Sequence, residues 1–504
     1  MASLPNSQCM ETSNSPNENT KPTINVACIR KCIKSMPKNL KSKAVETVKF
    51  TKKIGEDDPR RIVHSVKVGL ALTLVSSLYF FRPLYAGFGQ AGMWAILTVV
   101  LVFEFTVGGT LSKSLNRGCA TLLAGALGIG AEYLANLCGD KGEPIVLGLM
   151  VFILATSATF TRFFPDVKRR YDYGVLIFII TFTLVAVSGF RVSEILALAH
   201  QRLSTILIGG ATCILISIFV CPVWAGQDLH YLIAANIEKI ALFLEGFGGE
   251  FMSFPENEDE KSITTDKDKS FLVAYKSVLN SKTTEETLAN LAWWEPCHGQ
   301  FRFRHPWGQY LKTGALATEC AHHIKIIHKY VYLKPQVTSE LIKKIQEPCR
   351  IISTESSQAL KQLSSSIKNM TFPLPETETH IRTCNAAAND LKIILEKPYL
   401  PDQDHSQETI QLLFLASVLI DIVKSVENIS VSVNELSQKA GFRQQNPKAE
   451  KQQHQLLHRG IVQPVNNFDI SDNSNCVVID VHKLAGGQET LAQAMEREKL
   501  ETRS

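Results

Sequence analysis

The sequence lacks the short motifs that mark most enzymes and nucleotide-binding proteins. It contains no Gly-rich phosphate loop, no nucleophile elbow and no pair of carboxylates in a catalytic arrangement. A short Gly-rich run at 246–249 lacks the strand–turn–helix context that a nucleotide fingerprint needs. We therefore expect a protein that is not an enzyme and needs no cofactor. The net charge of +5 is modest, so it gives no case for a nucleic-acid partner.

Patterns for disulfides, metal sites and secretion are missing as well. The 12 cysteines include no CxxC pair, and Cys119 and Cys213 lie inside apolar runs, so we expect mostly reduced, structural thiols. The histidines between 298 and 328 do not have the spacing of a zinc site, so no metal is predicted. Residues 1–20, which are rich in Ser, Asn and Pro, lack the apolar core of a cleaved signal peptide.

Long apolar runs between Ile62 and Gly226 are the main feature that is present. The runs without any charge are 83–103, 144–161, 173–190 and 203–226. A bilayer needs roughly 20 mostly apolar residues for each spanning helix. A buried soluble bundle is the alternative, but soluble helices need a polar face and these runs mostly lack one. The sequence predicts transmembrane helices near 62–81, 86–107, 115–136, 144–162, 173–190 and 202–222.

The distribution of charge predicts how these helices are oriented. Between Lys21 and Lys53 there are ten Lys or Arg and a single acid, which is either a patch for anionic lipid headgroups or a solvated tail. The loops after the second and fourth predicted helices are basic, and the loops on the opposite side are nearly neutral. Cytoplasmic loops carry the excess of Lys and Arg, so both termini are expected to be cytosolic.

Beyond Gln227 the chain is polar and shows no convincing strand alternation. Helical periodicity singles out the segments 229–243, 271–279, 310–331, 337–363 and 410–436. We predict an all-α membrane protein with a tail at 1–61, a six-helix transmembrane domain at 62–226, a helical cytosolic domain at 227–442 and a loose tail at 443–504. Prolines are expected to break the helices of the cytosolic domain at Pro296, Pro306, Pro335, Pro348, Pro373 and Pro375.

An internal similarity links the third and sixth predicted helices. The ten residues from Arg117 and the ten from Arg202 align without gaps and share the arginine, a leucine, a glycine and an alanine. The segments lie three spans apart and cross in opposite directions, as in an inverted 3+3 repeat. Each arginine is expected at a helix N-terminus, where the dipole and free N–H groups favour anions. The alternative is interfacial snorkelling.

Three other charged residues lie within or beside the apolar runs, namely Lys67, Glu104 and Arg162. A charge at bilayer depth is costly, so it is expected to face a partner or a water-filled cavity. Glu104 could pair with Lys113 or Arg162 and would then be structural. Lys67 and Arg162 could line a cationic vestibule, and we include both, together with Lys113, among the candidate anion-binding residues.

The chain resembles the plant aluminium-activated malate transporter family, whose members are anion channels. The resemblance rests on stretches from about Glu56 to Ala440, among them Met93-Trp-Ala95, Phe103-Glu-Phe105, Tyr171-Asp-Tyr-Gly174, Cys221-Pro-Val-Trp-Ala-Gly226 and Trp294-Glu-Pro-Cys-His-Gly299. It implies a homodimer in the lipid bilayer, with arginines at positions 117 and 202 lining the pore. It also implies transport of malate and, in some members, of chloride, nitrate or sulfate.

The chain differs from aluminium-responsive members of the family at the positions where those members carry acids. Members that respond to aluminium carry acids on the outer face, whereas this chain has Ala86 and Ala197 there and keeps only Glu194 as a candidate external cation ligand. A hard trivalent cation needs several oxygen ligands, so aluminium activation is not expected.

The WEPxHG element of the cytosolic domain is expected to have a structural or gating role, through Trp294, Glu295, Pro296, His298 and Gly299. A coupled organic-anion carrier and a membrane-tethered scaffold or sensor remain alternatives to a channel. We expect the protein to lie in the plasma membrane rather than in the vacuolar membrane. Anion preference and the gating stimulus stay open.

Overall fold

A computed structural model describes residues 38–80, 93–189, 195–251, 271–331, 340–396 and 407–444. Among these residues the regular structure is helical, and pairing of extended backbone is limited to two isolated bridges, His298 with Phe301 and Thr371 with Arg443. The all-α prediction is therefore confirmed for the described chain.

The apolar part of the chain folds into helices whose bounds differ by several residues from those predicted. They are α3 (Pro59–Phe80), α5 (Met93–Val102), α6 (Val107–Asn136), α7 (Gly139–Thr161), α9 (Asp172–Gly189) and α10 (Ile195–Phe219). Two polar helices accompany them: α2 (Lys38–Asp57), in the stretch predicted as a tail, and the short α8 (Pro165–Arg170). Three segments are long and apolar enough to cross a bilayer, within α6, α7 and α10. The apolar helices α5 and α9 are shorter, and α3 carries Arg60, Arg61 and Lys67.

The start of α6 is the largest difference from the prediction. We expected this helix to begin near residue 115, but Thr106 caps it eight residues or so earlier, where its hydroxyl accepts a hydrogen bond from the Gly109 N–H. Ser and Thr are favoured at this position because they satisfy a free N–H of the first turn. Arg117 therefore lies in the third turn of α6, about 15 Å along the helix, and not at its N-terminus.

Two small buried clusters hold the apolar helices together. The first joins α3, α5 and α10 and contains Ala71, Val75, Ala95, Val99, Val102, Phe103, Cys213 and Ile216. The second joins α6, α7 and α9 and contains Ala124, Ala131, Ala135, Leu147, Phe182 and Ala186. Alanines dominate the second cluster, as expected where helices pack closely in lipid, whereas the first combines alanine with valine and larger side chains. The helices α6 and α10 also pack on each other.

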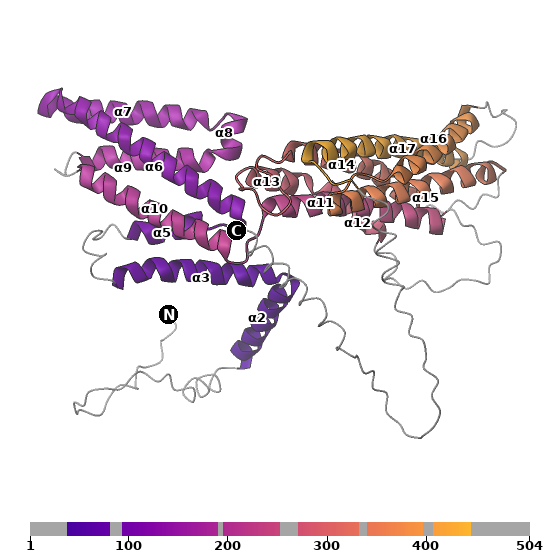
Figure 1. Cartoon of the computed structure of the whole chain (residues 1–504), viewed down its shortest axis with the longest axis horizontal. Coiled ribbons are helices and arrows are strands. Elements are labelled where there is room, and N and C mark those ends of the chain that lie inside the picture. The colour runs from indigo at the N-terminus through magenta and orange to yellow at the C-terminus, as the bar shows by residue number, and fades with distance from the viewer. Residues whose placement is uncertain are drawn as a thin grey trace, which may run out of the picture. The chain divides into compact units, whose positions relative to one another are not determined.

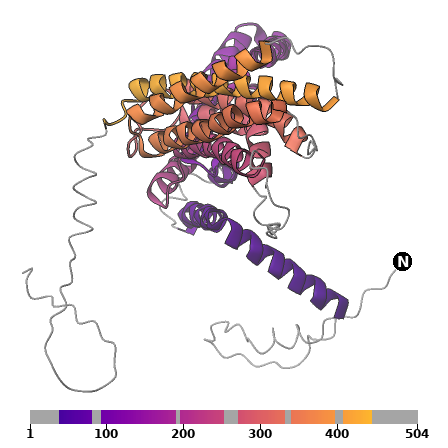
Figure 2. The same ribbon diagram turned by 90° about the vertical axis from the view of Figure 1, so that its right-hand side faces the viewer.

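The remaining helices form a second hydrophobic core. They are α11 (Ala225–Gly246), α12 (Phe271–Leu279), α13 (Lys282–Ala292), α14 (Trp307–Val331), α15 (Glu340–Asn369), α16 (Pro375–Glu396) and α17 (Gln407–Ala440), with a π-helical turn η2 (Phe247–Phe251) after α11. The long helices α11, α14, α15 and α17 run alongside one another (Figures 1 and 2).

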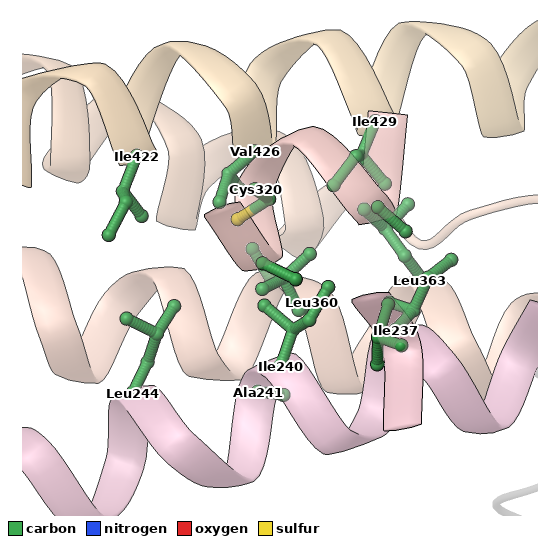
Figure 3. Close-up of a cluster of buried hydrophobic side chains, with 14 of the residues drawn as sticks. Ile237, Ile240, Ala241, Leu244, Cys320, Leu360, Leu363, Ile422, Val426 and Ile429 are labelled. Carbon is green, nitrogen blue, oxygen red and sulfur yellow. The ribbon is translucent and has the colours of Figure 1, made fainter. Parts of the chain in front are cut away.

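The centre of this core is aliphatic (Figure 3). Ile237, Ile240 and Leu244 of α11 face Leu360 and Leu363 of α15, and the facing side chains of α14 and α17 are Cys320, Ile422, Val426 and Ile429. These side chains have no exposed surface apart from Val426, which is 1% exposed. Burying each large aliphatic side chain contributes about 1.5–3 kcal/mol, so the helical region has a core of its own.

Two details of the helical region were not predicted correctly. Pro348 was expected to end a helix, but it lies inside α15, where a helix of 30 residues continues on both sides of it. Pro375 does begin a helix, as proline often does, since its missing N–H has no helical partner at the first position. The helices α13 and α16 were not among the segments singled out by periodicity.

Candidate functional site

Arg117 is a buried cation in the middle of the apolar helices. It is 4% exposed, and its Nη1 donates a hydrogen bond of 3.2 Å to the hydroxyl of Tyr173 on α9. Its Nε is buried without a hydrogen-bond partner. Among the described residues no carboxylate lies within ion-pairing distance of this guanidinium. Arg117 is thus restrained but not neutralised.

Arg202, on α10, is half-buried and also contacts an aromatic ring. Its guanidinium lies over the ring of Trp94 on α5, 4.9 Å from the ring centroid. In the part of the chain that the structure describes, it also has no carboxylate partner. The prediction placed Arg202 at a helix N-terminus, whereas α10 already begins at Ile195.

Two other predicted pore cations, Lys113 and Arg162, form ion pairs with carboxylates. Lys113 forms an ion pair with Glu104, one of the two partners that the sequence offered for this acid, and it lies 5.6 Å from the centroid of the Tyr173 ring. Arg162 binds both oxygens of Asp172, at 2.7 and 3.2 Å. Such a bidentate pair fixes the guanidinium and offsets most of its charge.

Lys67 has a structural partner. The residue is 2% exposed, and its ammonium donates a hydrogen bond of 2.7 Å to the carbonyl of Cys221. Cys221 has a φ of 43°, in the left-handed region, immediately after α10 ends. Lys67 therefore satisfies a carbonyl at the irregular turn that joins the apolar helices to α11.

Glu295 of the WEPxHG element lies at the same turn, where the first turns of α6 and α11 meet, and we call this meeting point the joint. It is 4% exposed and accepts hydrogen bonds from the N–H groups of Ala225 (2.6 Å) and Gly226 (3.0 Å), at the start of α11. The Gly108 N–H of α6 also bonds to it. Burial raises the pKa of Glu295 to about 7, although these hydrogen bonds favour the charged form. One carboxyl thus connects the first turns of α6 and α11.

The neighbouring residues of the element pack around this carboxyl. The His298 ring stacks on Trp224 with centroids 3.8 Å apart, and its Nδ1 lies 2.9 Å from the Pro296 carbonyl. Gly299 has a φ of 52°, which a glycine adopts at little cost. Trp294 meets Tyr171, the residue before α9, edge to face at 5.9 Å. The element is a rigid turn against the apolar helices.

The remaining predictions concern the outer face and metals. Glu194 and Ala86 lie outside the described residues, as does the part of the basic stretch 21–53 that precedes residue 38. Within the described ranges no group of three or more His, Cys, Asp or Glu side chains could hold a metal ion.

Sequence reasoning missed the aromatic partners of the two arginines. Trp94 and Tyr173 both fall in stretches that carry the family resemblance, yet neither was assigned a role. An arginine and an aromatic residue that lie 56 or 108 positions apart leave no periodic signal. Only the packing of α9 on α6 and of α5 on α10 brings them together.

Comparisons with known proteins identify the family to which the chain belongs. The model of the family described as "Aluminium activated malate transporter" matches residues 52–401. Aluminum-activated malate transporter 2 of Arabidopsis thaliana is 49% identical over 439 residues, covering 87% of this chain and 86% of the relative. Aluminum-activated malate transporter 1 of Triticum aestivum is 44% identical over 429 residues, covering 82% and 91%. The chain therefore belongs to the aluminium-activated malate transporter family.

Proposed function

We propose that this protein is an anion channel that conducts malate, and also chloride, nitrate or sulfate, through a pore lined by Arg117 and Arg202. Its family is one of membrane transporters, so the protein is a multi-pass membrane protein and not an enzyme. The relatives are named for malate, which supports malate as the substrate.

The proposal rests on which of the cations have a carboxylate partner and which do not. Lys113 and Arg162 have carboxylate partners, whereas Arg117 and Arg202 have none among the described residues: Arg117 bonds to the Tyr173 hydroxyl and Arg202 lies over the Trp94 ring. A desolvated guanidinium without a counter-charge is costly and attracts an anion. An anion that enters a low-dielectric pore needs such fixed charge to replace its hydration. We assign Lys67, Lys113 and Arg162 to shaping a vestibule.

Six spans fit the apolar helices best. Besides the three long segments, α5 and α9 are apolar, and the sequence from Pro83 to Phe103 carries no charge. The sixth span is α3, which carries no charge after Lys67. Six spans put both termini on one side, which the excess of Lys and Arg identifies as the cytosol. We also propose that the channel is a homodimer, as the family resemblance implies, and that it lies in the plasma membrane.

The packing supports the inverted repeat. Exchanging α3, α5 and α6 with α7, α9 and α10 converts one buried cluster into the other. The offset of 85 residues that aligns Arg117 with Arg202 holds within the clusters, where it pairs Ala131 of α6 with Ile216 of α10. The same offset pairs Gly128, which lies against Val185 of α9, with Cys213, which packs with α5.

The test is a single-channel recording from the purified protein in a planar bilayer, with malate on one side and chloride on the other. We expect unitary openings and a reversal potential that shows passage of both anions. A coupled carrier, which the repeat also suits, would give malate flux without unitary openings. A scaffold or sensor would give neither, and either result would overturn the channel.

A further inference from the structure

The two unpaired arginines are each held by one aromatic side chain, and the two contacts occupy corresponding places. Arg117 on α6 bonds to Tyr173 on α9, and Arg202 on α10 lies over Trp94 on α5. Exchanging the halves of the proposed repeat takes α6 to α10 and α9 to α5. The aromatic residues therefore come from equivalent helices.

The paired helices also run in the same direction in both cases. Gly128, 11 residues after Arg117, lies against Val185, 12 residues after Tyr173. Gly209, seven residues after Arg202, lies against Thr98, four residues after Trp94. Glycine lets each arginine-bearing helix approach its neighbour closely just beyond the contact. The close approach fixes the distance between each arginine and its aromatic partner.

We infer that Trp94 and Tyr173 are positioning residues that set the orientation of the Arg202 and Arg117 guanidinium groups toward the permeating anion. This inference rests on the proposed function, because it assumes that the two arginines face the pore.

The chemistry of the two partners explains why they suit this role. A carboxylate such as Asp172 occupies two donors of Arg162 and offsets its charge. The Tyr173 hydroxyl accepts from one donor of Arg117 and carries no charge. The face of the Trp94 ring attracts the guanidinium plane and leaves all five N–H donors at its edge. Both aromatics restrain the fork and keep it available for an anion.

The expected consequence concerns selectivity more than conduction. A carboxylate of malate can use two parallel N–H donors, so its permeation depends on the orientation of the fork. Chloride needs only positive charge. Loosening a guanidinium should therefore lower the permeability ratio of malate to chloride, by about threefold to tenfold for a contact of this kind.

The experiment measures that ratio from reversal potentials of the full-length channel, which do not depend on how many channels reach the membrane. The variants are Tyr173→Phe, which removes only the hydroxyl, and Trp94→Leu, which removes the aromatic face. Tyr133→Phe is the matched control, since Tyr133 lies exposed on α6. We expect the first two to lower the ratio and the control to leave it unchanged.

A double-mutant comparison separates positioning from a general structural effect. In an Arg117→Ala background Tyr173→Phe should cause no further change, and in an Arg202→Ala background the same should hold for Trp94→Leu. An equal shift with and without the arginine would overturn the positioning role, as would an unchanged ratio in both single aromatic variants. If the two arginine variants alone leave malate permeation intact, the proposed pore itself is wrong.

Discussion

The carboxyl of Glu295 makes the joint between α6 and α11 sensitive to pH. Its pKa is raised from 4.5 to about 7 because the group is buried. A carboxyl with a higher pKa in the closed joint stabilises that joint when protonated. This contribution is fully present below pH 4.5 and is lost as the pH rises through about 7. The joint is therefore expected to open more often at pH 8 than at pH 5.

The size of the effect follows from the two pKa values. The whole difference between the pKa of an ordinary carboxyl and that of Glu295 is worth about 3 kcal/mol. Between pH 5 and pH 8 most of this, roughly 2–3 kcal/mol, is lost, because at pH 5 the carboxyl of the open form is already partly ionised; this is on the order of 70-fold in the opening equilibrium.

Hydrogen–deuterium exchange of the amides at the start of α11 measures this opening, because the Ala225 and Gly226 N–H groups donate to Glu295. After correction for intrinsic exchange, protection in the wild type should fall by about 70-fold from pH 5 to pH 8. Glu295→Gln removes the titration and should flatten the profile.

Glu347→Gln is the control for this measurement, since Glu347 is exposed and bound to Arg350. It should leave the wild-type profile unchanged. Protection that does not depend on pH in the wild type, or an equal dependence in Glu295→Gln, would refute the reasoning.

Three further predictions follow from packing, charge and composition. Gly226→Ala should destabilise the protein by about 1–3 kcal/mol in thermal unfolding, because the added Cβ would lie 2.4 Å from the Trp307 ring. The control is Gly308→Ala, whose added Cβ meets nothing within 4 Å and should be neutral. A glycosylation acceptor inserted at 140–143 should be modified and one at Lys168 should not, and the opposite pattern would reverse the orientation. Micromolar external aluminium should leave the current unchanged, because alanines occupy two positions that are acidic in responsive members; strong activation would contradict this.

Much of the helical architecture could be predicted because its signals are local. Apolar runs of spanning length identified most of the helices in the apolar part of the chain, and periodicity identified α11, α12, α14, α15 and α17. The start of α6 was missed because a single capping hydroxyl, that of Thr106, decides it within an apolar run. Pro348 was misjudged because tertiary packing of a long helix outweighed its local effect.

The candidate site was predicted less completely. The arginines could be selected because charge is rare in the apolar runs, and Glu104 could be matched with Lys113 as one of two options. The aromatic partners and the hydrogen bonds of Glu295 could not be selected, because they join residues 56 to 187 positions apart. Such contacts depend on how the helices pack, which a single sequence does not record.

Malate current per channel at the cell surface, measured with Arg117→Ala and Arg202→Ala combined, tests the central claim most directly. Whole-cell current with malate as the main anion is divided by the amount of surface-labelled protein. We expect the double variant to lose most of the malate current while it still reaches the membrane, because the pore then lacks the fixed charge that replaces hydration of the anion. A normal malate current per surface channel would remove both arginines from the pore and contradict the account.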